Sequence, residues 1–186
     1  SHRRSQIIEN VEYSEGPMDI LLTHGYFLCE DTHEQAIMRP YPPLGLLYLS
    51  SHLKASGFEV EIFDTTFSSW PAFQQYLAAK RPPVVGVYGN LLTRPNVLRI
   101  VRLGKKLGST VVLGGPEPAS YAEEYLACGA DVVVAGEGEL TLEELLPQLL
   151  RVGTDGLPPV GGSGLSVRAC HPPYTGGYPL GWGSEW

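Results

Sequence analysis

Five short apolar segments alternate with five amphipathic segments along most of the chain, and this alternation constrains the fold more than any other feature. The apolar segments are rich in Val, Ile and Leu, which is typical of strands buried on both faces. Strands are predicted at Asp19–Thr23, Val60–Asp64, Val84–Tyr88, Thr110–Leu113 and Asp131–Ala135. Helices are predicted between them at Leu44–Ala55, Pro71–Lys80, Asn96–Leu107, Ala119–Cys128 and Thr141–Leu150.

Strands and helices that alternate in this way predict an α/β domain with a parallel sheet, right-handed crossovers and helices on both faces. Local signals support the helix ends. Ser69 is a candidate N-cap, Gly57 and Gly108 follow two predicted helices, and Thr141–Glu144 fits a capping box. We expect a flavodoxin-like (Rossmann-like) five-stranded sheet in the order 2-1-3-4-5. This order places a ligand crevice at the carboxyl ends of the first and third strands.

The 186 residues divide by composition into three parts. Residues 1–17 form a polar arm, residues 18–150 the α/β domain, and residues 151–186 a linker or irregular tail. This last part contains nine Gly and five Pro, which disfavours another helical unit. Leu165–Arg168 is the one further strand candidate in it.

Charge and composition exclude several classes of function. The net charge is −7 without a long basic run, so nucleic-acid binding is not expected. No apolar stretch approaches the roughly 20 residues that span a bilayer, and the first residues lack an apolar signal-peptide core. The cysteines, Cys29, Cys128 and Cys170, lie far apart, which fits a reducing compartment, and we expect a cytoplasmic protein.

The loops that follow the predicted strands are the candidate site. The first, His24–Pro43, is long for such a connection, and three others begin with glycine directly after a strand: Gly89–Pro95, Gly114–Pro118 and Gly136–Glu139. Glycine makes tight turns, but it also lets a large ligand approach the backbone. Three such loops on one sheet edge favour a ligand site.

The usual nucleotide signatures are missing from this edge. No G-x-G-x-x-G follows the first strand, and no G-x-x-x-x-G-K-[ST] occurs anywhere in the chain. A Rossmann dinucleotide site and a P-loop are therefore not expected. A flavin site would favour a hydroxyl-rich phosphate loop after the first strand, which His24-Gly25-Tyr26-Phe27 does not supply.

Four segments together resemble the cobalamin-binding domain of cobalamin-dependent radical S-adenosylmethionine enzymes. They are PYPPLGLLYL at 40–49, GFEVEIFD at 57–64, VLGGPEP at 112–118 and ADVVVAGEGE at 130–139. The resemblance covers about residues 18–150. It implies a cobalamin (vitamin B12, a cobalt cofactor) across the carboxyl edge of the sheet, with its nucleotide tail in a crevice near the first and third strands.

The resemblance also implies a set of cofactor contacts in the loops and at the start of the first helix. They are Pro43, Leu44, Gly45, Asn90, Leu91, Leu92, Thr93, Gly114, Gly115, Pro116, Glu117, Gly136, Glu137, Gly138 and Glu139. Such domains serve methyltransferase-type enzymes in which a radical domain binds S-adenosylmethionine and a 4Fe–4S cluster. The cysteine triad of that domain is absent from these 186 residues. We therefore expect a cofactor module or carrier that is not active alone and that works with a radical partner.

His33 is the candidate lower axial ligand of cobalt. It lies in Asp31-Thr32-His33-Glu34-Gln35-Ala36, which resembles the D-x-H-x-x-G motif of methionine-synthase-like domains but is displaced and lacks the glycine. A binding mode without histidine ligation is the main expectation. A small zinc site of His24, Cys29 and His33 with Asp31 is an alternative for the same loop.

Two other functions remain open at the level of sequence. One is a stand-alone enzyme that uses cobalamin without a radical cluster. The other is a flavodoxin-like domain that binds a flavin or another nucleotide-tailed cofactor.

Overall fold

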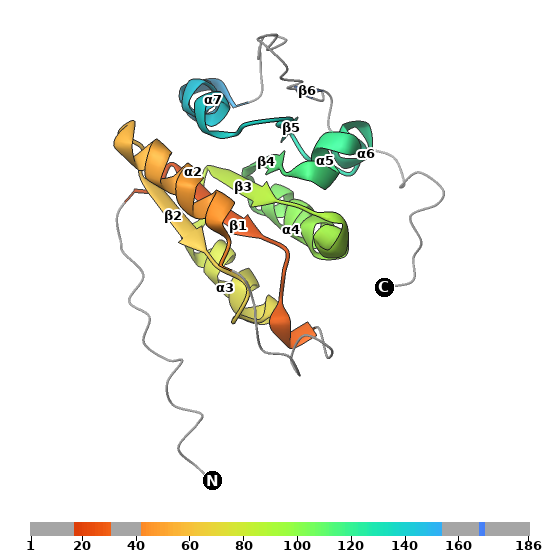
Figure 1. Ribbon diagram of the computed structural model, residues 1–186. Helices are drawn as coiled ribbons and strands as arrows, with labels where there is room; N and C mark the ends of the chain where they lie inside the picture. Colours follow the sequence, from red (N-terminus) through yellow and green to blue (C-terminus); the bar gives the residue numbers. More distant parts are fainter. Residues whose placement is uncertain (1–16, 31–41, 154–167, 170–186) are drawn as a thin grey trace.

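The computed structural model describes residues 17–30, 42–153 and 168–169, and Figure 1 shows a sheet with helices packed on both of its faces. The strand order is β2-β1-β3-β4-β5-β6. The strands are β1 Ile20–His24, β2 Val60–Phe63, β3 Val84–Tyr88, β4 Thr110–Gly114, β5 Val132–Val133 and β6 Arg168–Ala169. β1 to β5 are parallel, which confirms the predicted order 2-1-3-4-5. β6 pairs antiparallel to β5, and the rest of the predicted strand Leu165–Arg168 lies outside the described residues.

The helices connect successive strands, as the alternation of the sequence predicts. Those of α type are α2 Leu44–Ala55, α3 Trp70–Lys80, α4 Arg94–Leu107, α5 Pro116–Ser120, α6 Ala122–Ala127 and α7 Glu139–Val152. Two short 3-10 helices, η1 Leu28–Glu30 and η2 Leu91–Thr93, follow β1 and β3. Among the described helices, none has the length and apolar composition that crossing a membrane requires.

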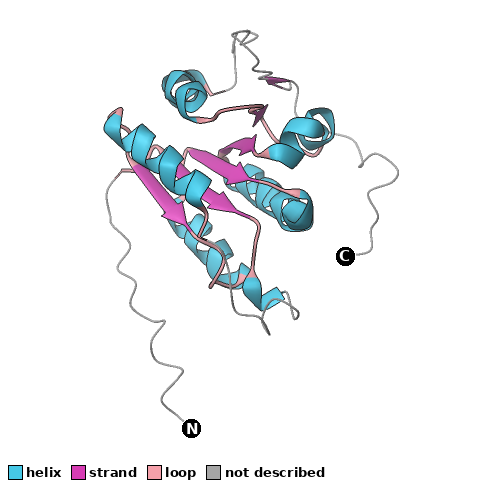
Figure 2. Ribbon diagram, in the orientation of Figure 1, coloured by secondary structure: helices cyan, strands magenta, loops and turns pink. Residues whose placement is uncertain are grey.

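The sheet divides the apolar core into two halves. Figure 2 shows the helices that lie on either side of the strands. One half joins the sheet to α3, α4 and α6, and the other joins it to α2 and α7. Successive strand residues point to opposite faces, so Leu21 belongs to the first half while Ile20 and Leu22 belong to the second. Strands buried on both faces explain why the apolar segments show no polar alternation.

Two helix predictions need correction. The predicted helix Ala119–Cys128 is two helices, because Tyr121 takes a non-helical backbone (φ −126°, ψ 40°) between α5 and α6. The predicted capping box at Thr141 is wrong. α7 begins at Glu139, and the Thr141 hydroxyl inside its first turn donates to the Glu137 carbonyl at 2.9 Å. The N-cap prediction for Ser69 is confirmed, since its hydroxyl accepts from the Ala72 amide at 3.4 Å.

The loops after β3 and β4 approach each other closely at the carboxyl edge of the sheet. The Gly89 amide donates to the Gly114 carbonyl at 2.8 Å. Gly115 has φ +108°, and a Cβ there would lie 2.3 Å from the Gly89 carbonyl oxygen. Both the backbone angle and the contact require glycine at this position.

We therefore expect Gly115→Ala to lower the free energy of unfolding by more than the roughly 1–3 kcal/mol that backbone strain alone costs. Gly108→Ala is the matched control. It has φ +87° but open space around the added methyl group, so it carries strain without a clash. Urea unfolding of both variants measures the difference. Equal losses would show that the contact between the two loops adds nothing.

Candidate functional site

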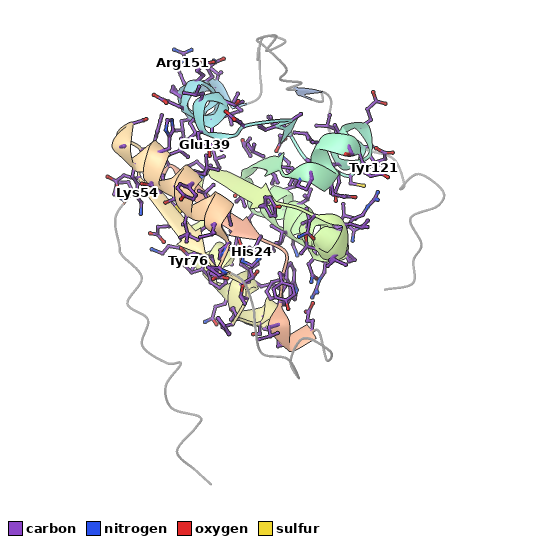
Figure 3. All side chains as sticks on the ribbon, viewed as in Figure 1. His24, Lys54, Tyr76, Tyr121, Glu139 and Arg151 are labelled. Atoms are coloured by element: carbon purple, nitrogen blue, oxygen red, sulfur yellow. The ribbon has the colours of Figure 1, made fainter. Side chains whose placement is uncertain are left out.

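The candidate site lies at the carboxyl edge of the sheet, on the side covered by α2 and α7. Every second residue of a strand points to the same face, so the last residues of three strands lie on the same face as the core residues that contact α2 and α7. These last residues are His24 of β1, Tyr88 of β3 and Gly114 of β4, and they are neighbours in the strand register. Figure 3 labels His24 at this end of β1 and Glu139 at the start of α7.

Three of the predicted contact glycines border open space. A Cβ added at Gly45, Gly114 or Gly136 would meet no atom within 4 Å. Gly45 and Gly114 also have ordinary backbone angles, so neither conformation nor packing within the described residues requires glycine there. They come from the start of α2 and the end of β4, and Gly136 follows β5. Bare backbone at these three positions, called the cradle glycines below, leaves room for a ligand to approach closely.

Two other predicted glycines contact protein. Gly115 is directed at the Gly89 carbonyl and the Tyr88 ring, so the structure gives it a packing role between two loops. Gly138 lies beside Leu49 of α2, whose methyl carbons would be 3.9 Å from an added Cβ. Contact of either residue with a cofactor stays a prediction.

The predicted contacts after β3 form a fixed turn. The Asn90 side chain accepts from the Thr93 amide and the Thr93 hydroxyl accepts from the Asn90 amide, both at 3.0 Å. This reciprocal cap holds η2 so that Leu91 and Leu92 project outward with 70% and 88% exposure. Two exposed leucines on a rigid turn suit an apolar contact.

Glu117 is a predicted contact whose carboxylate is buried in the fold. It is 5% exposed, accepts a hydrogen bond from Tyr125 and pairs with Arg94 at 3.0 Å. The Arg94 guanidinium also lies over the Tyr121 ring, 5.1 Å from its centroid. Burial, and after it the hydrogen bond to Glu117, raises the pKa of Tyr125. The structure thus shows Glu117 tying α5 to α4 and α6.

The remaining predicted contacts lie around the cradle. Pro43 is half-buried and precedes α2, while Leu44 is exposed in the first turn of that helix. Pro116 is exposed at the start of α5. Glu137 is exposed and Glu139 half-buried where α7 begins.

Exposed apolar side chains gather in the segments that follow the strands. They are Leu44, Leu47, Tyr48, Phe67, Leu91, Leu92 and Leu140. The first half of α2 is apolar on both its buried and its exposed sides, which is unusual for a helix that faces water on one side. Such a surface is typical of a binding interface.

A buried histidine closes the β1 end of this edge. His24 is 6% exposed, its Nε2 bonds Asp64 Oδ1 at 2.9 Å, and its Nδ1 accepts from the Tyr26 amide at 3.2 Å. The amide donor leaves Nδ1 unprotonated and Nε2 as the donor to Asp64. The Thr65 hydroxyl lies 3.1 Å from Nδ1. With both nitrogens engaged, His24 is closed to metal in this arrangement.

The predicted metal ligand His33 lies outside the described residues, as does Asp31 of the alternative zinc site. Within the described part of the chain, no group of three or more His, Cys, Asp and Glu side chains is placed to hold a metal ion. Sequence analysis missed Asp64 and Tyr88. Each ends a predicted strand, and that position could have marked both as candidate site residues. Their contacts with residues of neighbouring strands, such as Asp64 with His24, are shown only by the structure.

Burial lowers the pKa of His24, and the Asp64 carboxylate only partly offsets this effect. The unfolded chain, with a histidine pKa of about 6.5, then binds more protons than the folded chain as the pH falls. This part of the stability is present above pH 6.5 and is lost below it. Burial alone would raise the pKa of Asp64, but its hydrogen bonds with Thr66 and His24 outweigh burial and lower this pKa. The contribution of Asp64 to stability is therefore lost only at lower pH, as the carboxylate becomes protonated.

We expect the free energy of unfolding to fall between pH 7 and pH 5, by at most about 1.4 kcal/mol per pH unit from one histidine. His24→Gln should flatten this slope, whatever its effect at pH 7. Urea unfolding at half-unit pH steps measures both slopes. An unchanged slope in the variant would mean that His24 does not titrate differently on folding.

Comparison with known proteins gives the same assignment as the residues. The family model "B12 binding domain" matches residues 37–146. An uncharacterized methyltransferase from Pyrococcus horikoshii is 32% identical over 117 residues, which cover 58% of this chain and 25% of the relative. An uncharacterized methyltransferase from Synechocystis sp. is 28% identical over 62% of this chain and 21% of its own length.

A third relative is the hopanoid C-3 methylase of Methylococcus capsulatus, which is 31% identical over 60% of this chain and 23% of its own length. The chain therefore spans about a quarter of each of these relatives. The matched segment runs from the end of the first loop to α7 and contains the cradle glycines Gly45, Gly114 and Gly136. The chain belongs to the B12-binding domain family.

Proposed function

We propose that this domain binds cobalamin at the carboxyl edge of its sheet and acts as the cofactor module of a methyltransferase-type enzyme. One observation supports this most directly. In a chain of the B12-binding family, Gly45 and Gly114 border open space at this edge, and neither backbone angle nor packing within the described residues requires glycine there. Gly136 also borders open space, although its φ of +93° by itself favours glycine. A large ligand needs such bare backbone at the ends of parallel strands.

The residues present fit this cofactor. The cradle glycines would hold it from below, and the rigid turn of Leu91 and Leu92 would cover apolar parts of the ring system. Gly138 and Glu139, at the start of α7, would close the α7 side. When bound, cobalamin supplies a cobalt-carbon bond from which a methyl group can be transferred.

The chain's own contribution is to bind, orient and exclude water. Exposed leucines at the edge would desolvate the cofactor, and the helix starts on either side would fix its position. His24 would hold the β1 end of the edge in shape through Asp64 and Thr65 instead of serving as a ligand. This proposal agrees with a binding mode in which no histidine of the described residues contacts cobalt.

Substituting the open glycines tests the placement of the cofactor. We expect Gly114→Leu and Gly45→Leu each to weaken hydroxocobalamin binding at least tenfold, because a side chain would fill the cradle. Ala55→Leu is the matched control, since it adds a side chain to the exposed far end of α2, at the opposite edge of the sheet. Desalting followed by visible absorption, and titration calorimetry, measure the bound fraction and the affinity.

Binding by the unmodified chain and loss in the two glycine variants, with the control unchanged, supports the proposal. Undiminished binding in both glycine variants would contradict the placement. No retention of cobalamin by the unmodified chain would contradict the function itself.

We further propose that a radical S-adenosylmethionine domain covers this edge. The relatives that are named methyltransferases or methylase are about four times as long as the matched segment, so they carry further chain. Leu44 and Leu140 are exposed in the first turns of α2 and α7, and the exposed acidic residues Asp64 and Glu137 follow β2 and β5. The basic residues Lys54, Lys80 and Lys105 instead lie in the last turns of helices, at the opposite edge. A partner with apolar and basic groups would complement this surface.

A module of this kind should not cleave S-adenosylmethionine. We expect the cobalamin-loaded chain, incubated with S-adenosylmethionine and dithionite, to form no 5′-deoxyadenosine above a control without protein. Chromatography of the nucleoside products measures this. Formation of 5′-deoxyadenosine by the purified chain would contradict the division of labour and favour a stand-alone enzyme.

A further inference from the structure

The carboxyl ends of β1 and β3 mark the point where the chain changes direction across the sheet. The connection from β1 runs through α2 to β2 on one side, and the connection from β3 runs through α4 to β4 on the other. In open parallel sheets, the crevice that binds a ligand lies between the two strands where the direction reverses. The residues that end these strands are His24 and Tyr88, which are neighbours in the register.

Tyr88 is the exposed member of this pair. Its side chain is 39% exposed, whereas His24 is 6% exposed and the other residues of β3 are buried. Every second residue of a strand points to the same face, and Val84 belongs to the half of the core that joins the sheet to α2 and α7. Tyr88 therefore lies on that side of the sheet, which is also the side of the candidate site.

The ring of Tyr88 is supported by backbone from the loop after β4. A Cβ added to Gly115 would lie 3.1 Å from the ring atoms Cδ2 and Cε2. Gly115 is itself fixed, because it packs against the Gly89 carbonyl. Since β3 lies between β1 and β4, this support is on the side away from the crevice.

The hydroxyl of Tyr88 makes no hydrogen bond with residues 17–30 or 42–153. The buried tyrosines Tyr76 and Tyr125 differ, since each donates to a glutamate. Tyr88 also stacks on no other aromatic ring of the described chain. An exposed ring that is supported on one side and stands at a crevice suits a flat ligand group.

The polar side chains at the ends of this strand pair already have partners within the fold. Both ring nitrogens of His24 are engaged, one with a carboxylate and one with a backbone amide. In the turn after β3, the side-chain oxygens of Asn90 and Thr93 accept from each other's amides. These atoms are not free to select a ligand group by its hydrogen-bonding edge, so we expect recognition here to depend on the flat face of the Tyr88 ring.

We propose that the ring of Tyr88 stacks on the base of the cofactor's nucleotide tail, and that the domain therefore accepts corrinoids with different bases. This inference rests on the proposed cobalamin function. It goes beyond the tail crevice that the resemblance implies, because it names the residue in contact with the base and predicts little selectivity for that base. Stacking uses the π face that all aromatic bases share. Neighbouring strands lie about 4.8 Å apart, so the ends of one strand pair suit a base better than the wider corrin ring.

The test measures the affinity for several corrinoids by titration calorimetry. They are cobalamin with its dimethylbenzimidazole base, analogues with adenine or p-cresol in its place, and cobinamide, which has no base. The unmodified chain is expected to bind the base-bearing corrinoids within about threefold of one another, and cobinamide about tenfold or more weakly. Tyr88→Ala should weaken the base-bearing corrinoids by about tenfold or more and leave cobinamide within about threefold.

Other variants separate the ring from its hydroxyl and from the stability of the fold. Tyr88→Phe keeps the ring and should bind every corrinoid as the unmodified chain does. Leu150→Ala removes an exposed apolar side chain from the far end of α7 and is the matched control. Tyr88→Leu keeps apolar volume without a flat ring, so it replaces the alanine variant if that variant unfolds in urea too early to be used.

Each result decides between named alternatives. An equal loss of cobinamide and of base-bearing corrinoids in Tyr88→Ala would place the ring against the corrin and overturn the base assignment. A preference of more than about tenfold for one base would overturn the predicted tolerance. Equal affinities in all variants would remove Tyr88 from the site while leaving the cobalamin function intact, whereas no corrinoid binding by the unmodified chain would remove the function itself.

Discussion

The parallel direction of the first five strands is the constraint on which the rest of the molecule depends. Because all five point the same way, every connecting helix starts near the carboxyl ends of the strands. The loops that carry the candidate site residues therefore all lie at this one end of the sheet. Bare glycines, exposed leucines, a supported tyrosine and a buried histidine come from segments far apart in sequence. None of these features would form a site in an antiparallel sheet with the same residues.

Much of this fold could be predicted from the sequence because burial on both faces leaves a clear pattern. Continuous runs such as Val84–Tyr88 mark strands of a parallel sheet, and helix boundaries followed from Gly108 and Ser69. The errors arose where a tertiary contact prevailed over local preference. The chain breaks at Tyr121, where the ring packs beneath Arg94, and no short-range signal reveals that interaction.

The sequence predicted that the loops after the strands meet at one end of the sheet, but it did not predict the division of roles among their glycines. In sequence, Gly114 and Gly115 are equivalent members of one turn. In the structure, Gly114 borders open space, whereas Gly115 packs against the Gly89 carbonyl. This difference depends on how the loops after β3 and β4 meet. The same limit applies to His24. Its sequence position suggested a metal ligand, whereas the neighbouring strand supplies Asp64 and encloses the imidazole.

The ion pair of Glu117 with Arg94 has a consequence for the entropy of binding. Together with the hydrogen bond from Tyr125, it joins the turns after β3 and β4 into one preorganised body, so little conformational freedom remains to be lost there when a ligand arrives. On the other side of the proposed site, α2 and α7 are joined by apolar packing and by the His52–Glu143 pair, whose side chains are 33% and 39% exposed. Exposed pairs of this kind contribute about 0–1 kcal/mol. In the proposed site, the wall built by the turns after β3 and β4 would therefore set the orientation of a ligand, and the wall of α2 and α7, whose polar contact is weak, would adjust to its size.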